Sequence, residues 1–379
     1  MKKIYYITAV FATLFLVGCG DGIDLPGVNV ETDLNKIPLP DNNVNLEQVE
    51  LKPSTEPMLH EGLHTEEDFQ RIRDKKAAGE EPWVSAYQLL VESQFSQKTA
   101  DTYPTEWIKR GVSGDENYMN AARGATIVYQ QALRWKIEQD DEYAAKAVEN
   151  LNKWVQTCVG VTGNTNLSLA AGLYGYEFAI AGELLRDYGG WDRADFAAFQ
   201  NWLLKVFYPA NDDFLKRHHD TNALHYWANW CLCNIAAKMA IGIVTDRRDI
   251  YNEGIAHLQT GDTNGRLRRA IYHDYAPDYN FAQWQESGRD QGHTLMCVGL
   301  MGVICQLAWS QGDDFFAYDD NLFLRACEYA ACCNYTNETV PYTTYIWQKQ
   351  SQWGYPIPEE QTALGGGKWI KRAIWALPY

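Results

Sequence analysis

The sequence lacks the excess of positive charge that a general nucleic-acid-binding protein carries. Its 379 residues include 33 Lys and Arg against 49 Asp and Glu, a formal net charge of −16. Nucleic-acid-binding domains are usually basic. The sequence also lacks a Gly-rich phosphate loop and any nucleotide or flavin motif, so we expect no cofactor. Hydrophobic residues make up 46% and charged residues 22%, a globular composition that excludes a disordered chain.

Strand-type alternation of apolar and polar residues is also scarce, and no fixed repeat period is visible. From about residue 60 the pattern is helical. Thr65 is a good N-terminal cap for a helix that runs to Gly79, and Pro82 can open the next helix. The further helices that we expect cover residues 116–138, 141–159, 167–188, 192–207, 222–245, 247–259, 290–311 and 319–335.

Three helical stretches, 170–185, 226–244 and 294–309, are apolar on all sides. Such helices are usually buried. More amphipathic helices lie between them and are joined to them by short loops. This alternation predicts an all-α fold, an (α/α) toroid or incomplete barrel of helical hairpins with the apolar helices inside. An irregular helical bundle is the alternative.

The N-terminus has the pattern of a targeting segment. A basic start, Met1-Lys2-Lys3, precedes an apolar run that is too short for a comfortable membrane span. The run ends in Leu16-Val17-Gly18-Cys19, which resembles a bacterial lipobox and implies cleavage before Cys19 and a lipid on that cysteine. We expect a signal peptide over 1–18, a flexible tether over 19–55 and one catalytic domain over 56–379. The protein would lie in the periplasm or at the outer membrane; an ordinary cleaved secretory signal is the alternative.

The nine cysteines do not have the spacing of a zinc site. The pair Cys231-x-Cys233 has no second half nearby, and we expect no metal. Most of the other cysteines lie in apolar helical stretches, where cysteine behaves as a small hydrophobic residue. Disulfide pairing is left open.

Unusual polar groups gather in three stretches next to the apolar helices: 164–166, 216–230 and 264–293. In a toroid, the starts of the inner helices surround one mouth of the ring, so these stretches would converge. Helix N-termini favour anions. An acidic protein that concentrates Arg and His at such a mouth is suited to an anionic ligand.

Several segments resemble polysaccharide lyases of the alginate-lyase type. The stretch from Leu59 to Asp68, followed by Gly79-Glu80-Glu81-Pro82-Trp83, is similar to the start of such domains. Segment 269–275 (RAIYHDY), and Asn222 with His225-Tyr226-Trp227, resemble family 5 of these lyases. The lipoprotein signal and segment 286–293 (ESGRDQGH) are more similar to family 38.

The resemblance implies β-elimination at a uronate of alginate or a related polyuronate such as mannuronan or glucuronan. The carboxylate beside C5 must then be neutralised, and the resemblance gives this role to Asn164, His225 and Arg269. Tyr275 would be the acid and possibly also the base. His225 would be the base if the proton and the leaving group lie on opposite sides of the sugar ring.

The remaining site residues are assigned to substrate binding: Asn166, Asn222, Trp230, Arg268, His273, Gln285, Glu286, Arg289 and His293. Arg268 is the alternative to Arg269, because it restores the family 5 spacing to the tyrosine. We expect a monomer whose partners are an anionic polysaccharide and, through Cys19, the membrane.

Two other functions compete with the lyase. A glycoside hydrolase on the same toroid would need two carboxylates, with Asp220, Asp274, Glu286 and Asp290 as candidates. A non-catalytic, lipid-anchored glycan-binding protein would also suit the 13% aromatic content.

Overall fold

Helices form most of the protein, and the prediction of an all-α fold is confirmed. The structure is a computed structural model that describes residues 48–287, 290–335 and 340–341. The elements in chain order are α2 (Glu66–Ala77), α3 (Trp83–Glu92), η3 (Gln94–Ser96), β1 (Trp107–Arg110), α4 (Tyr118–Glu138), α5 (Asp141–Thr157), β2 (Gly160–Gly163), α6 (Leu167–Leu185), α7 (Arg193–Val206), α8 (Tyr208–Arg217), η4 (His218–Asp220), α9 (Ala228–Val244), α10 (Arg248–Thr260), α11 (Leu267–Ala270), β3 (Ile271–Asp274), β4 (Ala282–Trp284), α12 (Gln291–Ser310) and α13 (Tyr318–Tyr335).

The three apolar helices form the inner layer, as their composition predicts. Helix α9 packs against both α6 and α12, and α4 packs on the other side of α6. Nearly every residue of α6 and α9 is buried. Gly172 of α6 lies so close to Cys233 of α9 that a Cβ atom would come within 2.5 Å of its sulfur. By length and composition α12 could cross a membrane, but 56% of its apolar window is buried inside the protein.

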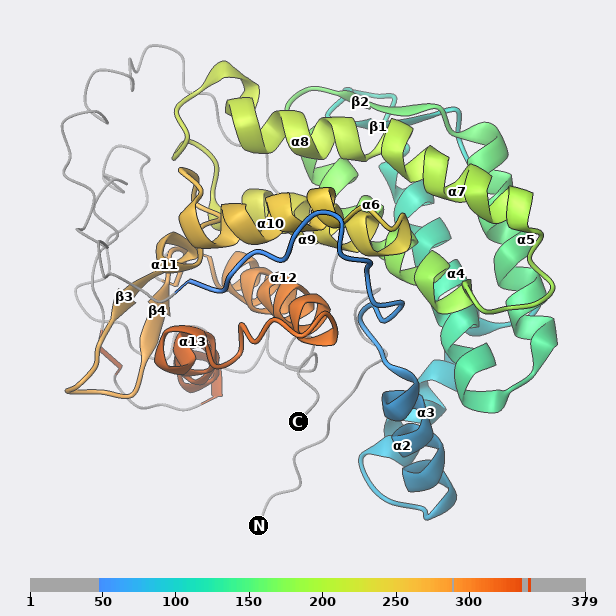
Figure 1. The fold of residues 1–379 in the computed structure, drawn as a ribbon, viewed down its shortest axis with the longest axis horizontal. Helices are drawn as coiled ribbons and strands as arrows, with labels where there is room; N and C mark the ends of the chain where they lie inside the picture. Colours follow the sequence, from blue (N-terminus) through green and yellow to red (C-terminus); the bar gives the residue numbers. More distant parts are fainter. Residues whose placement is uncertain (1–47, 288–289, 336–339, 342–379) are drawn as a thin grey trace.

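The helices α5, α7, α10 and α13 are the outer partners of the inner helices. Each follows an inner helix after a short connection and turns back along the outside, so that the chain forms successive helical hairpins (Figure 1). This is the toroid of hairpins that the alternation of apolar and amphipathic helices predicts.

Two features differ from the sequence expectation. The helix expected over 222–245 begins only at Ala228, because the Asn222 side chain accepts a hydrogen bond from the Leu224 backbone (2.9 Å) and forms a turn instead. The short helix α8 and four short strands were not expected. Strands of three or four residues are too short to show alternation.

The segment expected as a tether lies mostly outside the described residues, together with Cys19. Its last residues contact the outer helix α10. The backbone N–H of Val49 donates to Gln259 Oε1 (2.7 Å), and Gln259 Nε2 donates back to the Val49 carbonyl (3.0 Å). The chain is therefore already attached to the helical domain at Val49.

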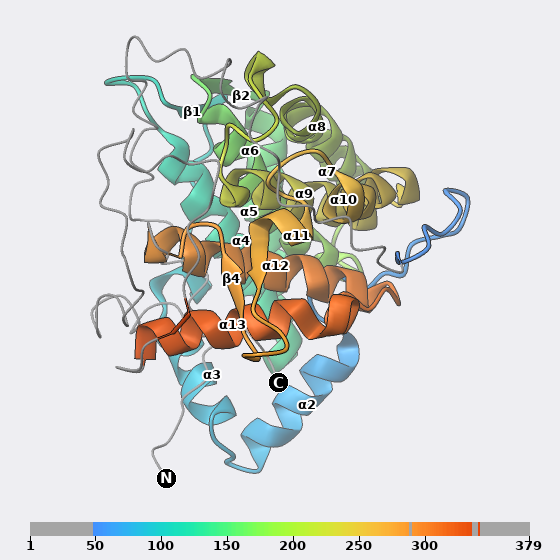
Figure 2. The ribbon, with the colours of Figure 1, turned by 90° about the vertical axis from the view of Figure 1, so that its left-hand side faces the viewer.

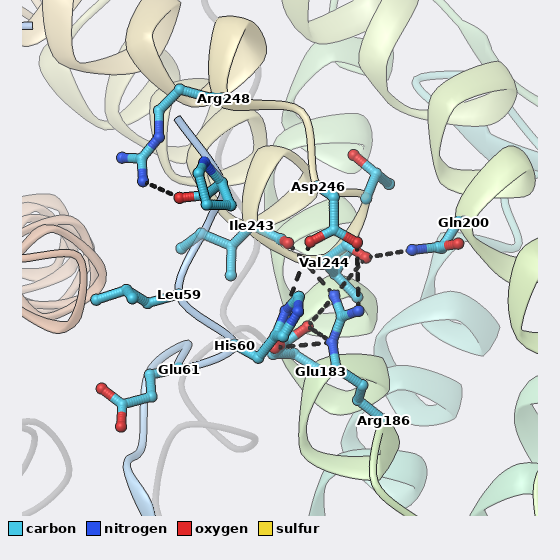
Figure 3. A network of polar contacts seen from close by, with 12 residues as sticks. Leu59, His60, Glu61, Glu183, Arg186, Gln200, Ile243, Val244, Asp246 and Arg248 are labelled. Carbon is cyan, nitrogen blue, oxygen red and sulfur yellow. Dashed lines mark hydrogen bonds and ion pairs between the residues drawn. The ribbon is translucent and has the colours of Figure 1, made fainter. Parts of the chain in front are cut away.

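A polar network joins the C-terminal ends of α6 and α9 (Figure 3). Arg186 pairs with Glu183 (2.9 Å) and with Asp246 (3.4 Å), and donates to the carbonyls of Ile243 (3.4 Å) and Val244 (2.8 Å). These carbonyls belong to the last turn of α9; the Ile243 carbonyl also accepts from the Asp246 backbone N (3.2 Å), and the Val244 carbonyl from Gln200 Nε2 (2.7 Å). The network thus fixes the two inner helices at the end opposite to their starts.

Candidate active site at the starts of the inner helices

The first part of the site is built by the parallel pair β1 and β2. Because the strands are parallel, the loops that lead into α4 and α6 leave from the same edge. Gly111 follows β1 with a positive φ of 77°, and a Cβ atom there would come within 1.8 Å of Asn164 Oδ1. Only glycine allows this approach. Asn164 is exposed, and its Oδ1 accepts from the backbone N and the Nδ2 of the buried Asn166 (2.9 Å each).

The loop between α8 and α9 contacts the start of α6. His219 Nε2 lies 3.0 Å from Ser168 Oγ. His218 is buried, stacks on Phe214 and lies 3.5 Å from Cys231 Sγ. Burial lowers the pKa of His218 to about 4, so this imidazole is neutral at physiological pH.

The sequence-predicted residues His225 and Trp230 lie at the start of α9. His225 is half-buried, with its ring 4.8 Å from that of Tyr226, and the ring of Trp230 packs in a tilted arrangement against the same tyrosine, with 4.7 Å between the ring centroids. Two buried amides hold this segment. Gln285 Oε1 accepts from the backbone N of Ala228 (3.1 Å), and Asn264 Nδ2 donates to the carbonyls on either side of His225 (3.0 and 2.8 Å).

The adjacent arginines point to different neighbours. Arg268 makes ion pairs with Asp319 and with Asp274 (3.6 Å to the latter). Arg269 instead donates to the Asp262 carbonyl. Burial lowers the pKa of His257 to about 4, and the positive charge of Arg269 adds to this effect. Arg268 is therefore directed toward the outer helix α13, whereas Arg269 lies toward α9 and α10.

Tyr275 comes directly after β3, within the antiparallel hairpin of β3 and β4, which faces the viewer beside α13 in Figure 2. Its hydroxyl donates to Gln283 Oε1 (2.5 Å), and its ring stacks on that of Tyr329 of α13 at 6.1 Å. His273 lies against the same ring at 4.4 Å between centroids. Burial lowers the pKa of His273, and the nearby Asp274 opposes this effect.

The start of α12 carries a second polar cluster. Asp290 caps the helix, since its Oδ1 accepts from the His293 backbone N (3.0 Å). His293 Nδ1 lies 2.8 Å from Asp290 Oδ2 and 3.5 Å from Glu286 Oε1. Glu286 is 1% exposed. The predicted substrate contact Arg289 lies outside the described residues.

The contacts connect three of the predicted segments into one region. His219 joins the start of α6 to the loop before α9, and Gln285, the residue after strand β4, joins the start of α9 to that strand. The same strand carries Gln283, the partner of Tyr275. Sequence reasoning counted Tyr272, the second partner of Gln283, among the unusual polar groups of stretch 264–293, but it did not single out Gln283. The available signal was the alternation of Gln283 in β4 and Gln285 directly after it, but this alternation covers only three residues.

Comparisons with known proteins agree on one family. The family model described as alginate lyase matches residues 72–338. A comparison with curated proteins found no match. A histidine-to-alanine variant of alginate lyase A1-III, complexed with a tetrasaccharide, is 12% identical over 73% of this chain and 78% of that chain, with a TM-score of 0.56.

Two further solved structures are similar. Alginate lyase A1-III from Sphingomonas species A1 is 13% identical over 73% of this chain and 79% of that chain (TM-score 0.53). An alginate lyase from Bacteroides ovatus is 15% identical over 78% of this chain and 86% of that chain (TM-score 0.51). At these identities the structural likeness establishes the fold.

Proposed function

Because the chain belongs to the alginate lyase family, and is thus a polysaccharide lyase that acts on an anionic polysaccharide, we propose that it cleaves alginate or a related polyuronate by β-elimination at the starts of its inner helices. The observation that carries this assignment is the continuous set of contacts from Ser168 through His219, and from Ala228 through Gln285 to the Tyr275 hairpin. These contacts support the proposal, because they link segments that carry the residue types that elimination requires.

The first requirement is neutralisation of the uronate carboxylate. The C5 proton is weakly acidic, because its removal pushes negative charge onto the neighbouring carboxylate. Donors that are held in place stabilise this developing charge. Asn164, His225 and Arg269 are the proposed donors, with Asn166 as the substitute for Asn164. Between the two arginines, the ion pairs of Arg268 with Asp319 and Asp274 favour Arg269.

The second requirement is proton transfer. Tyr275 is the proposed acid, which gives a proton to the leaving O4. It is also the proposed base when the C5 proton and O4 lie on one side of the ring. His225 is the proposed base when they lie on opposite sides. A tyrosine can act as both acid and base only if its surroundings stabilise the phenol and the phenolate.

The further residues proposed to contact the substrate are Asn222, Trp230, His273, Gln285, Glu286, Arg289 and His293. Gln285 also has a structural role, because its Oε1 accepts a hydrogen bond from the first backbone N–H of α9. Its substitution should therefore disturb both the position of His225 and any contact to the sugar.

The test is a lyase assay across a panel of mannuronan, guluronate-rich alginate and glucuronan. Elimination creates a conjugated double bond that absorbs ultraviolet light, whereas hydrolysis creates reducing ends without this absorbance. Tyr275→Phe should fold with unchanged circular dichroism and lose turnover by about 10²–10⁴-fold, the usual effect of removing a positioned acid or base. Near-normal turnover of this variant on the best substrate would remove Tyr275 from the mechanism.

We also propose that Cys19 carries a lipid that anchors the protein in the bacterial envelope. The support is the lipobox-like sequence Leu16-Val17-Gly18-Cys19. Cells fed a labelled fatty acid should incorporate the label into the wild-type protein and not into Cys19→Ala. Equal labelling of both proteins would contradict the anchor.

A further inference from the structure

Gln283 lies between two tyrosine hydroxyls inside the β3–β4 hairpin. Its Oε1 accepts the hydroxyl proton of Tyr275 (2.5 Å), and its Nε2 donates to the hydroxyl oxygen of Tyr272 (2.9 Å). The glutamine is 1% exposed and Tyr272 is 7% exposed. A buried amide needs partners for its polar atoms, and here both partners are groups that can donate or accept.

This arrangement has a second form with the same number of hydrogen bonds. A half-turn of the amide about its last side-chain bond exchanges Oε1 and Nε2. In this second form Nε2 donates to the Tyr275 oxygen, while the Tyr272 hydroxyl donates to Oε1. The first form suits a neutral Tyr275, which has a proton to give. The second form suits a Tyr275 phenolate, which can only accept.

We propose that Gln283 is a positioning residue for Tyr275, holding its oxygen in place as a phenol and, after the half-turn, stabilising it as a phenolate. This inference rests on the proposed function of Tyr275. In the elimination, the phenolate oxygen takes the C5 proton, and the C5–H electron pair forms the C4–C5 double bond. The bond from C4 to the leaving oxygen breaks, and the new phenol proton passes to that oxygen. Tyr275 is then a phenolate again.

The resting phenol must therefore first release its proton to solvent, and a donor at its oxygen lowers the pKa at which this happens. The other titratable and charged groups around Tyr275 come from three elements. They include His273 and Tyr272 of β3, the Asp274 carboxylate in its ion pairs with Arg325 and Arg268, and Tyr279. Helix α13 adds Tyr329, Cys332 and Cys333, which pack in the same cluster as Tyr275. Among these described neighbours, Gln283 is the group that is bonded to the Tyr275 hydroxyl and can exchange acceptor for donor.

The test measures kcat and KM across pH for Gln283→Met, which has a similar length and no amide. We expect kcat to fall by about 10²-fold, the scale of a misplaced catalytic group, with KM within about twofold. The rise of kcat with pH should move to higher pH, because the phenolate has lost its donor. Gln283→Glu keeps an acceptor but adds a negative charge that opposes the phenolate, so its loss and its shift should be larger.

Two further variants separate positioning from simple stability. Tyr272→Phe removes the second hydroxyl that is bonded to Gln283. It should lower kcat only a few-fold and move the rise of kcat to higher pH, as in Gln283→Met. Gln131→Met removes another fully buried amide, which donates to the backbone carbonyls of Gln97 and Ala100. It should lower thermal stability and leave kcat and its pH profile unchanged.

The outcomes of this series are distinct. An inactive Tyr275→Phe together with a normal kcat and pH profile in both Gln283 variants would overturn the role of Gln283 and leave the proposed function standing. A fully active Tyr275→Phe would instead overturn the proposed part of Tyr275, and the part of Gln283 with it. If Gln283→Met fails to fold, Gln283→Glu and Tyr272→Phe carry the test.

Discussion

Neighbouring arginines with different partners give a test at the scale of single residues. Arg269→Lys keeps the charge but loses the planar two-point donation that suits a carboxylate. Turnover should fall much more than affinity, because the lost contact strengthens as charge develops. Arg268→Lys should instead lower thermal stability with little effect on kcat, since Arg268 is paired with Asp319 and Asp274.

Steady-state kinetics and thermal unfolding of the two variants decide between them. A large loss of kcat in Arg268→Lys with little change in Arg269→Lys would assign the carboxylate contact to Arg268 instead of Arg269. Normal turnover in both would leave the carboxylate to Asn164 and His225.

Glu177 gives a prediction on pH and stability. It is half-buried, but its Oε2 atom is fully buried without a hydrogen-bond partner, and burial raises its pKa from 4.5 to about 8. Between these pH values the folded protein keeps a proton that the unfolded chain releases. The free energy of unfolding should therefore fall as pH rises from 4.5 to 8.

In Glu177→Gln there is no carboxyl group at this position, so no proton is released from it when the protein unfolds. Its stability should match the wild type near pH 4.5 and exceed it above pH 8 by at most about 5 kcal/mol, since each of the roughly 3.5 pKa units is worth about 1.4 kcal/mol. Denaturant unfolding at several pH values measures the difference, with the exposed Glu50→Gln as the control. Parallel stability curves for the wild type and Glu177→Gln would contradict the raised pKa.

At the scale of elements, the network at the ends of α6 and α9 should control how firmly these helices are joined (Figure 3). The side chains of Arg186 and Glu183 are 11% and 5% exposed. Arg186→Met leaves the Glu183 carboxylate buried without its cation, which should lower the free energy of unfolding by about 3–5 kcal/mol.

The double variant Arg186→Met/Glu183→Gln should recover much of this loss, because no buried charge remains. The loss that persists would come from the α9 carbonyls that Arg186 no longer contacts, at about 1 kcal/mol for each hydrogen bond. Chemical denaturation of both variants measures these values. A double variant that is as unstable as the single one would assign the effect to helix packing instead of charge.

For the whole molecule, the net charge of −16 sets how it meets a polyanion. Only a local cationic region can attract such a substrate, and Arg266 and Arg269 lie in the segment proposed to do so. Since screening limits exposed charges to a reach of about 10 Å at 0.1 M salt, added salt should raise KM more steeply than it lowers kcat. Initial rates over a series of ionic strengths test this. A KM that does not change with salt would argue for a neutral substrate.

Residue patterns within the chain were enough to predict most of the helices, though not the short helix α8, and to predict which of them lie inside. A helix that is apolar on all sides can satisfy that composition only in the interior, and so α6, α9 and α12 were identifiable as inner helices. The polar stretches that precede these helices were also identifiable, because each lies where an apolar run begins.

Only the tertiary structure decided which polar side chains meet. Arg268 pairs with Asp319, 51 residues along the chain, and Gln285 holds Ala228, 57 residues away. The amide of Gln283 faces Tyr272 and Tyr275 because a hairpin folds back on itself, within strands too short to show a period. Local periodicity reports which face of an element is buried, but a partner is set by how two elements pack, and that depends on the whole fold.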